Sequence, residues 1–224
     1  MGVGGQSGDS MTAEDFDAHF RRWVAAAVAE WNFPPPPEPY YAKTYKRLPA
    51  GLRTLLAQGI AEGLIIPRGR TFMLTGLDPS KGPYAWFSKY AAEQRPNPNW
   101  EYFVQVAEFV RLCRVARARG LTLTFEDHLM DLAIYDGDRL LVCIEVKERG
   151  RQVRELITRI RDYENGIDMK TPDRGNDPLR KANYIARRRP DYFCAVAIGA
   201  KLEYRVEYPD MVAFRFERDV IPWV

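Results

Sequence analysis

The feature that most constrains the fold of this chain is a pair of apolar runs, residues 132–135 and 140–144, separated by an Asp-Gly-Asp turn signal at 136–138. Two such runs on either side of an Asp-Gly turn predict a β-hairpin. The first run directly follows Asp131, and the second leads into Glu-Val-Lys at 145–147. The predicted hairpin therefore brings two carboxylates and one lysine into the same part of the fold.

The register of this hairpin decides whether the three side chains meet. With a three-residue turn at 136–138, Asp131 lies opposite Cys143. Asp131 and Glu145 are then diagonal neighbours on one face of the sheet, with Cβ atoms roughly 7 Å apart. Lys147 shares that face because it is two residues beyond Glu145. Two carboxylates so placed can bind one divalent cation, whereas a turn one residue longer or shorter would move Asp131 to the opposite face.

The composition is typical of a globular protein with a sizeable core: 224 residues, of which 46% are apolar and 28% charged. The formal net charge of +3 does not by itself predict a polyanionic partner. Between residues 147 and 189, however, basic residues outnumber acidic ones about two to one. This region fits a track along a phosphate backbone, with a solvated helix face as the alternative.

Cysteine usage and hydropathy indicate the cellular setting. The three cysteines are widely spaced in apolar segments, which is typical of reduced core residues in an intracellular protein. No stretch reaches membrane-span length, and no signal peptide is recognisable. We therefore expect a cytoplasmic protein without a membrane partner.

The first hundred residues are expected to form a separate region. The pattern predicts a disordered leader at 1–11, a helix from Thr12 to about Asn32, a stiff four-proline connector at 34–37, a helix over 49–62 and a hairpin over 64–74. A Pro-Asn-Pro sequence at 96–98 marks the boundary, so that residues 12–98 form an N-terminal region and 99–224 a second domain.

The helix and hairpin of this region resemble the end of a winged-helix module. In such modules the helix enters a DNA groove and the hairpin turn touches phosphate. The resemblance implies that Arg68 and Arg70, in the hairpin turn, contact nucleic acid. A helix–hairpin element with a purely packing role is the alternative interpretation.

The second domain is predicted to contain one helix, three strands, further helices and a return to strands. The expected elements are a helix at 100–119, strands at 121–125, 129–135 and 140–147, helices at 152–163 and 179–187, a buried strand at 192–198, and a final hairpin formed by 201–208 and 211–217. This order predicts an α/β (α+β) fold with a mixed central sheet flanked by helices.

The order αβββαβ, together with Asp131, Glu145 and Lys147, resembles the PD-(D/E)XK nuclease superfamily. The one departure is Met130, which stands where the superfamily often has proline. The resemblance implies a restriction-endonuclease-like core and metal-dependent phosphodiester cleavage. It implies that Asp131 and Glu145 bind Mg²⁺, or Mn²⁺ in its place, with the backbone carbonyl of Val146 as a further ligand. Lys147 would orient the attacking water or stabilise developing charge.

Further site residues are expected on the flanking helices. Glu101, Gln105 and Glu108 form one stripe on the long helix. Holliday-junction resolvases of the superfamily carry a glutamate on the first helix, and Glu108 is the nearest match to that residue. The resemblance implies that Glu108 could reach the metal. The alternative is that the stripe is a solvated helix face. The residues expected to bind nucleic acid after the motif are Arg149, Arg151, Gln152 and Arg154.

Three functions are compatible with these patterns. The first is a Mg²⁺-dependent DNA nuclease in restriction, phage defence or repair, acting on duplex DNA, plausibly as a homodimer because one such site cuts one strand. The second is a nuclease fold without turnover that binds nucleic acid or a partner protein. The third, a scaffold or enzyme subunit, is suggested by the small net charge and the aromatic residues at 84–87.

Overall fold

The computed structural model describes residues 12–77, 80–166 and 177–222. The chain divides into two units, Met1–Asn99 and Trp100–Val224. The leader expected at residues 1–11 lies outside the described residues.

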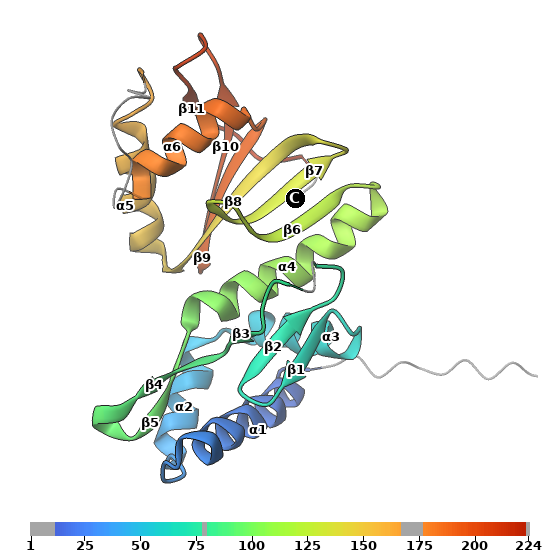
Figure 1. Cartoon of the computed structure of the whole chain (residues 1–224), viewed down its shortest axis with the longest axis vertical. Coiled ribbons are helices and arrows are strands. Elements are labelled where there is room, and N and C mark those ends of the chain that lie inside the picture. Colours follow the sequence, from blue (N-terminus) through green and yellow to red (C-terminus); the bar gives the residue numbers. More distant parts are fainter. Residues whose placement is uncertain (1–11, 78–79, 167–176, 223–224) are drawn as a thin grey trace, which may run out of the picture. The chain divides into compact units, whose positions relative to one another are not determined.

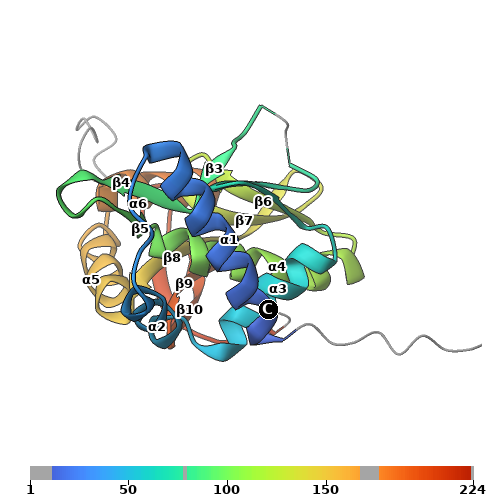
Figure 2. The same ribbon diagram turned by 90° about the horizontal axis from the view of Figure 1, so that it is seen from below.

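The N-terminal unit contains three helices followed by short strands (Figure 2). Its elements are α1 (Ala13–Trp31), α2 (Glu38–Arg47), α3 (Ala50–Ala61), β1 (Ile65–Arg68), β2 (Thr71–Leu74), β3 (Tyr84–Ala85), β4 (Phe87–Tyr90), the 3₁₀ turn η1 (Ala91–Glu93) and β5 (Arg95–Pro98). Strands β1, β2 and β3 form one antiparallel sheet, and β4 pairs with β5. The Asp15 carboxylate accepts hydrogen bonds from the backbone N–H and the hydroxyl group of Thr12, which caps the start of α1.

The helix α2 and the strands β3, β4 and β5 were not predicted from the sequence. Pro37 is the N-cap residue of α2, so the four prolines lead directly into a helix instead of a long connector. The unit is held by aromatic packing: the ring of Trp86 stacks on Trp23 and on Phe72, with centroids 4.7 and 3.9 Å apart. Such long-range ring contacts stabilise short strands whose own sequence signal is weak.

The C-terminal unit is a six-stranded sheet with helices on both faces (Figure 1). Its elements are α4 (Trp100–Ala118), β6 (Thr122–Asp127), β7 (Met130–Asp136), β8 (Arg139–Arg149), α5 (Gly150–Arg161), α6 (Asp177–Arg188), β9 (Tyr192–Ile198), β10 (Ala200–Glu207) and β11 (Arg215–Arg218). The strand order is β11-β10-β9-β8-β7-β6; β8 and β9 are parallel, and the other neighbours are antiparallel. This confirms the predicted α+β class and the mixed sheet flanked by helices.

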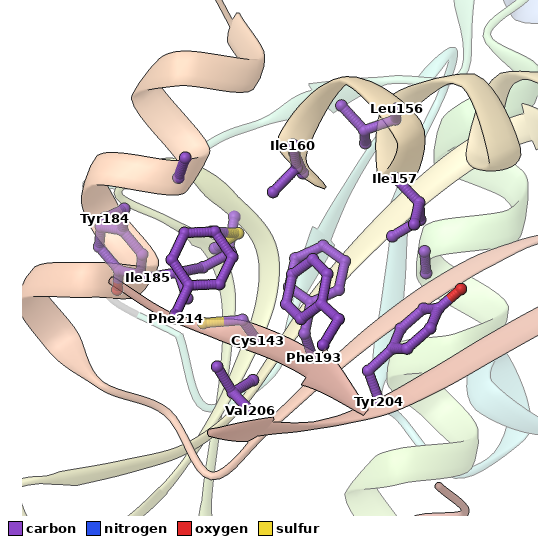
Figure 3. Packing of buried hydrophobic residues seen from close by; sticks show 14 of the residues in the cluster. Cys143, Leu156, Ile157, Ile160, Tyr184, Ile185, Phe193, Tyr204, Val206 and Phe214 are labelled. Carbon is purple, nitrogen blue, oxygen red and sulfur yellow. The ribbon is translucent and has the colours of Figure 1, made fainter. Parts of the chain in front are cut away.

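The core of this unit lies between the sheet and the helices α5 and α6. Figure 3 shows Ile157 and Ile160 of α5 over Phe193, with Ile185 of α6 beside them. Residues of β7, β8 and β9 that share this face alternate with residues that face α4. Because Cys143 belongs to this core, Glu145, two residues further along β8, points to the same side as α6.

The register predicted for the central hairpin is wrong in one respect. Asp136 pairs with Arg139, so the turn has two residues instead of three. A β-bulge follows, because Tyr135 pairs with Leu140 while Ile134 pairs with Val142. Cys143 therefore lies opposite Ala133, not Asp131. The shorter turn and the bulge each shift the pairing by one residue in the same direction, and the net shift of two residues leaves the faces of the two strands matched as predicted.

The final hairpin also differs from prediction. We expected a turn at Pro209-Asp210 with a strand from 211, but β11 begins at Arg215 and Glu207 pairs with it. Asp210 instead accepts hydrogen bonds from the backbone N–H groups of Val212 and Ala213, which closes a longer loop. All three cysteines are buried and none forms a disulfide. Within the described residues, no helix combines the length and apolarity that crossing a membrane requires.

Candidate metal centre at the end of the central sheet

The structure brings Asp131, Glu145 and Lys147 together at the end of β7 and β8. Leu132 pairs with Ile144, and Asp131 and Glu145 are the next residues beyond this pair on β7 and β8. The Asp131 carboxylate accepts a hydrogen bond from the Val146 N–H (2.6 Å), which fixes it against β8. The Lys147 ammonium lies 3.9 Å from Asp131 Oδ2 and 3.6 Å from Glu145 Oε2.

Glu145 is fully buried, and its two oxygens have different surroundings. Oε1 accepts a hydrogen bond from the ammonium of Lys181 on α6 (2.7 Å), which also donates to the carbonyl of Leu129 (2.8 Å). Oε2 is buried without a hydrogen-bond partner. Buried polar atoms are nearly always satisfied in proteins, so an orphaned carboxylate oxygen needs an explanation. A cation bound to Oε2 would provide one.

The helix α4 contributes two further side chains to this cluster. Lys147 Nζ donates to Glu101 Oε1 (2.9 Å) as well as to the carbonyl of Val146 (2.8 Å). Gln105, one turn further along α4 and also buried, donates to the backbone carbonyl of Asp131 (2.9 Å). Gln105 thereby fixes the backbone of β7 at Asp131, close to the start of the strand.

Glu108, the acid of α4 that we expected near the metal, has other contacts. Its carboxylate forms a two-point ion pair with Arg111, at 2.5 and 2.9 Å. The acid of this helix that reaches Lys147 is Glu101, two turns earlier. The stripe was therefore recognised correctly, but Glu101 is the member that the structure brings to Lys147.

Burial and charge shift the pKa values of the central groups. Burial raises the pKa of Glu145 to about 8, and the neighbouring Asp131 carboxylate adds to the effect while Lys181 and Lys147 oppose it. Burial likewise raises the pKa of Asp131 to about 6, against the opposing charge of Lys147. Burial alone would lower the pKa of Lys147, but the carboxylates of Glu145, Asp131 and Glu101 outweigh it and raise the pKa. Lys147 is therefore an ammonium ion at neutral pH.

The donor set fits a hard cation with few protein ligands. Across residues 12–77, 80–166 and 177–222, no three His, Cys, Asp or Glu side chains are grouped as a metal site would group them. Two carboxylates are nevertheless available at this centre, Asp131 and Glu145. Mg²⁺ commonly takes one or two carboxylates and keeps water on its other positions. The residues present are thus compatible with Mg²⁺, and the orphaned Oε2 atom marks where it would bind.

The residues predicted to bind nucleic acid after the motif lie at the start of α5. The Gln152 side chain accepts a hydrogen bond from the Arg149 N–H (2.9 Å) and so closes the first turn of the helix. Arg151 and Arg154 line a shallow cavity on the outer side of α5, and Arg151 also pairs with Glu155 (2.6 Å). None of these four is among the side chains that contact Asp131 or Glu145 in the described contacts.

In the N-terminal unit, the two predicted phosphate-contacting arginines differ. Arg68 is exposed at the end of β1. Arg70 pairs with Glu30 (2.7 Å) and lies over the ring of Trp31. Its guanidinium therefore ties the hairpin turn to α1.

Lys181 was missed in the sequence analysis, although a signal existed. It lies on the face of α6 that carries Ile185 and Tyr184, so a lysine occupies a position where the helical pattern calls for an apolar residue. A charged residue on an apolar face requires a buried partner. Its partner, Glu145, is 36 residues away in the chain, so the pairing could not be identified from spacing.

Comparison of the chain with protein-family models, with curated proteins and with solved structures gives no match.

Proposed function

We propose that this protein is a metal-dependent nuclease that hydrolyses phosphodiester bonds in DNA, as the PD-(D/E)XK enzymes that its motif resembles do. The observation that carries the proposal is the buried, orphaned Oε2 of Glu145 beside Asp131 and Lys147. Oε2 has an ion pair with Lys147 at 3.6 Å but no hydrogen-bond donor, and a buried carboxylate oxygen without one is unusual. A divalent cation, which prefers carboxylate oxygens as ligands, would satisfy it. The αβββαβ order of the C-terminal unit supports the same assignment.

The residues then have distinct roles. Asp131 and Glu145 would hold Mg²⁺, or Mn²⁺ in its place, and the Val146 carbonyl is a candidate third protein ligand. When bound, the ion would polarise the phosphoryl oxygen and lower the pKa of a coordinated water. Lys147 remains an ammonium ion, so it serves to stabilise negative charge on the phosphate and not as a general base.

The basic residues on both units favour a polyanionic substrate. Arg149, Arg151 and Arg154 follow the centre on α5, and Arg68 is exposed on the N-terminal hairpin. Such residues bind phosphates without sequence preference. Restriction, phage defence and repair are the settings in which a DNA endonuclease of this kind would act, and a dimer would allow both strands of a duplex to be cut.

A second candidate is a nuclease fold that binds nucleic acid or a protein without turnover. It is favoured by the two ammonium groups, of Lys147 and Lys181, that neutralise the carboxylates from within the protein. A centre whose carboxylates are neutralised by two ammonium groups is stable without a cation, so a protein that binds without cleaving is physically consistent with this arrangement.

A cleavage assay separates the two candidates. The purified protein is incubated with supercoiled plasmid, linear duplex and single strands in Mg²⁺, Mn²⁺ or EDTA. We expect cleavage that EDTA abolishes and that Asp131→Asn and Lys147→Ala each reduce at least a hundredfold. Glu217→Gln, which changes an exposed acid of β11, is the matched control and should retain full activity. Binding without cleavage in every metal would support the second candidate.

A further inference from the structure

A shallow, open cavity lies at the turn between β6 and β7, where Leu129 is two residues before Asp131. It has a volume of about 400 Å³ and is lined by His128, Leu129, Tyr184 and Arg188. The carbonyl of Leu129 accepts a hydrogen bond from Lys181, whose ammonium also holds Glu145. Tyr184 follows Lys181 by one turn of α6, and Arg188 follows by a second turn, so the cavity continues along the helix away from the centre.

The floor of this cavity is organised by a buried acid. Asp127 Oδ2 accepts hydrogen bonds from the hydroxyl groups of Tyr135 (2.5 Å) and Tyr184 (3.3 Å). Burying a carboxylate costs free energy that its partners must offset. Here the partners are the hydroxyl groups of two tyrosines, and the hydrogen bonds hold both rings in place. The Tyr184 ring lines the cavity, and the Tyr135 ring lies under Arg188, whose Cζ atom is 6.0 Å from the ring centroid.

The rim of the cavity is formed by a two-residue turn with an unusual residue. His128 has φ = +56°, in the left-handed region where glycine or asparagine is energetically favoured in such turns. Its side chain is 66% exposed, and its ring centroid lies 6.2 Å from that of Tyr184. The turn thus carries an imidazole at a backbone position that does not favour it, and the imidazole faces the cavity.

We propose that this cavity binds one unstacked nucleotide of the substrate, with the base against the rings of His128 and Tyr184 and a phosphate on Arg188. Bases stack on histidine, tyrosine and guanidinium planes. A cavity with one cation and two rings is suited to a nucleotide more than to a phosphate alone. A base within an intact duplex could not enter it, so the substrate would be a single-stranded end, a flap or a flipped nucleotide.

This inference rests on the proposed nuclease function, but binding can be tested without cleavage. Fluorescence anisotropy of a labelled ten-nucleotide oligothymidylate is measured in EDTA with wild type, His128→Asn, Arg188→Ala and Arg218→Ala. Asparagine tolerates the left-handed backbone and removes only the ring. Arg218, an exposed arginine of β11, is the matched control for lost positive charge.

We expect His128→Asn to weaken binding about tenfold or more because a stacking contact is removed, and Arg188→Ala to do the same because a phosphate contact is removed. Arg218→Ala should change binding less than twofold. Wild-type thermal midpoints for all variants would show that folding is retained. Equal affinity of wild type, His128→Asn and Arg188→Ala would overturn the inference, as would tighter binding of blunt duplex than of single strand by the wild type. Either result would leave Mg²⁺-dependent cleavage intact, whereas loss of cleavage in all metals with this binding pattern retained would count only against the nuclease.

Discussion

Glu145 is held between two lysines that reach it from different elements. Lys147 comes from the same strand, and Lys181 comes from α6 with its side chain only 7% exposed. A buried ion pair adds little stability compared with apolar packing, but removal of one partner leaves an uncompensated charge. The two lysines therefore differ in role: Lys147 contacts Asp131 and Glu101 as well, whereas the other ion-pair partner of Lys181 is the exposed Asp177 at 3.4 Å.

Substitution of Lys181 should destabilise the protein. Lys181→Met leaves Glu145 buried without its hydrogen-bond donor, which we expect to cost about 3–5 kcal/mol of unfolding free energy. Urea unfolding followed by circular dichroism measures the loss. Arg205→Met, which removes an exposed ion pair with Glu207, should have little effect. Equal stability of Lys181→Met and wild type would show that Lys181 does not support Glu145.

Cation binding at this centre should strengthen as the pH rises. The pKa values of Glu145 (about 8) and Asp131 (about 6) are raised, so both groups are partly protonated near neutrality in the metal-free protein. A cation binds only the carboxylate forms, and it must therefore displace protons below these pKa values. Isothermal titration with Mn²⁺ should show affinity increasing from pH 6 to pH 8. A flat profile over this range would contradict the assignment of both carboxylates as ligands.

Among the elements, the hairpin of β7 and β8 shows what the sequence can and cannot specify. The apolar runs and the Asp-Gly signal were sufficient to predict both strands and the shared face of Asp131, Glu145 and Lys147. The two-residue turn and the bulge before Val142 were not predictable, because each shifts the register by one residue in the same direction and only their sum, two residues, keeps the strand faces matched. Only the packing of both strands in the sheet decides where the extra residue is placed.

The start of α5 is a second place where packing sets a requirement. A Cβ atom added at Gly150 would lie 2.9 Å from the Cβ of Ala200, closer than such atoms approach in proteins. Gly150→Ala should therefore destabilise by about 1–3 kcal/mol through overpacking. Gly51→Ala in α3, where nothing lies within 4 Å, should be neutral or stabilising by up to about 1 kcal/mol. Thermal unfolding of both variants measures the difference. Equal midpoints would show that β10 moves to accommodate the added Cβ atom without loss of stability.

For the chain as a whole, the sequence predicted the α+β class and the order of the C-terminal elements more completely than the N-terminal ones. Long amphipathic or apolar segments, such as α4 and β9, carry strong periodic signals. The helix α2 and the short strands β3–β5 depend on contacts between distant aromatic residues, such as Trp23 and Trp86, and so left little local signal. Lys181 was missed as a site residue, and Glu108 was favoured over Glu101 in the stripe on α4, for the same reason: the partners of Lys181 and Glu101 lie far away in sequence.

If the N-terminal hairpin contacts phosphates, Arg68 should affect binding of the whole chain without affecting stability. Arg68→Ala should weaken duplex binding and reduce the slope of log affinity against log salt by about 1, because one phosphate contact is lost. Arg70 is unsuitable for this test, since its pairing with Glu30 has a structural role. Titrations of a labelled duplex between about 50 and 200 mM salt provide the measurement, and an unchanged slope would exclude Arg68 from the interface.

The most direct test of the account is a crystal structure of the protein soaked in Mn²⁺, with the ion located by its anomalous scattering. We predict a peak between Asp131 and Glu145, with the Glu145 Oε2 atom as a ligand at about 2.1 Å and Lys181 still bound to Oε1. A structure that contains Mn²⁺ elsewhere, or none, while Lys147 keeps its ion pairs with Asp131 and Glu145 and Lys181 keeps its ion pair with Glu145, would contradict the metal centre and the nuclease proposal with it.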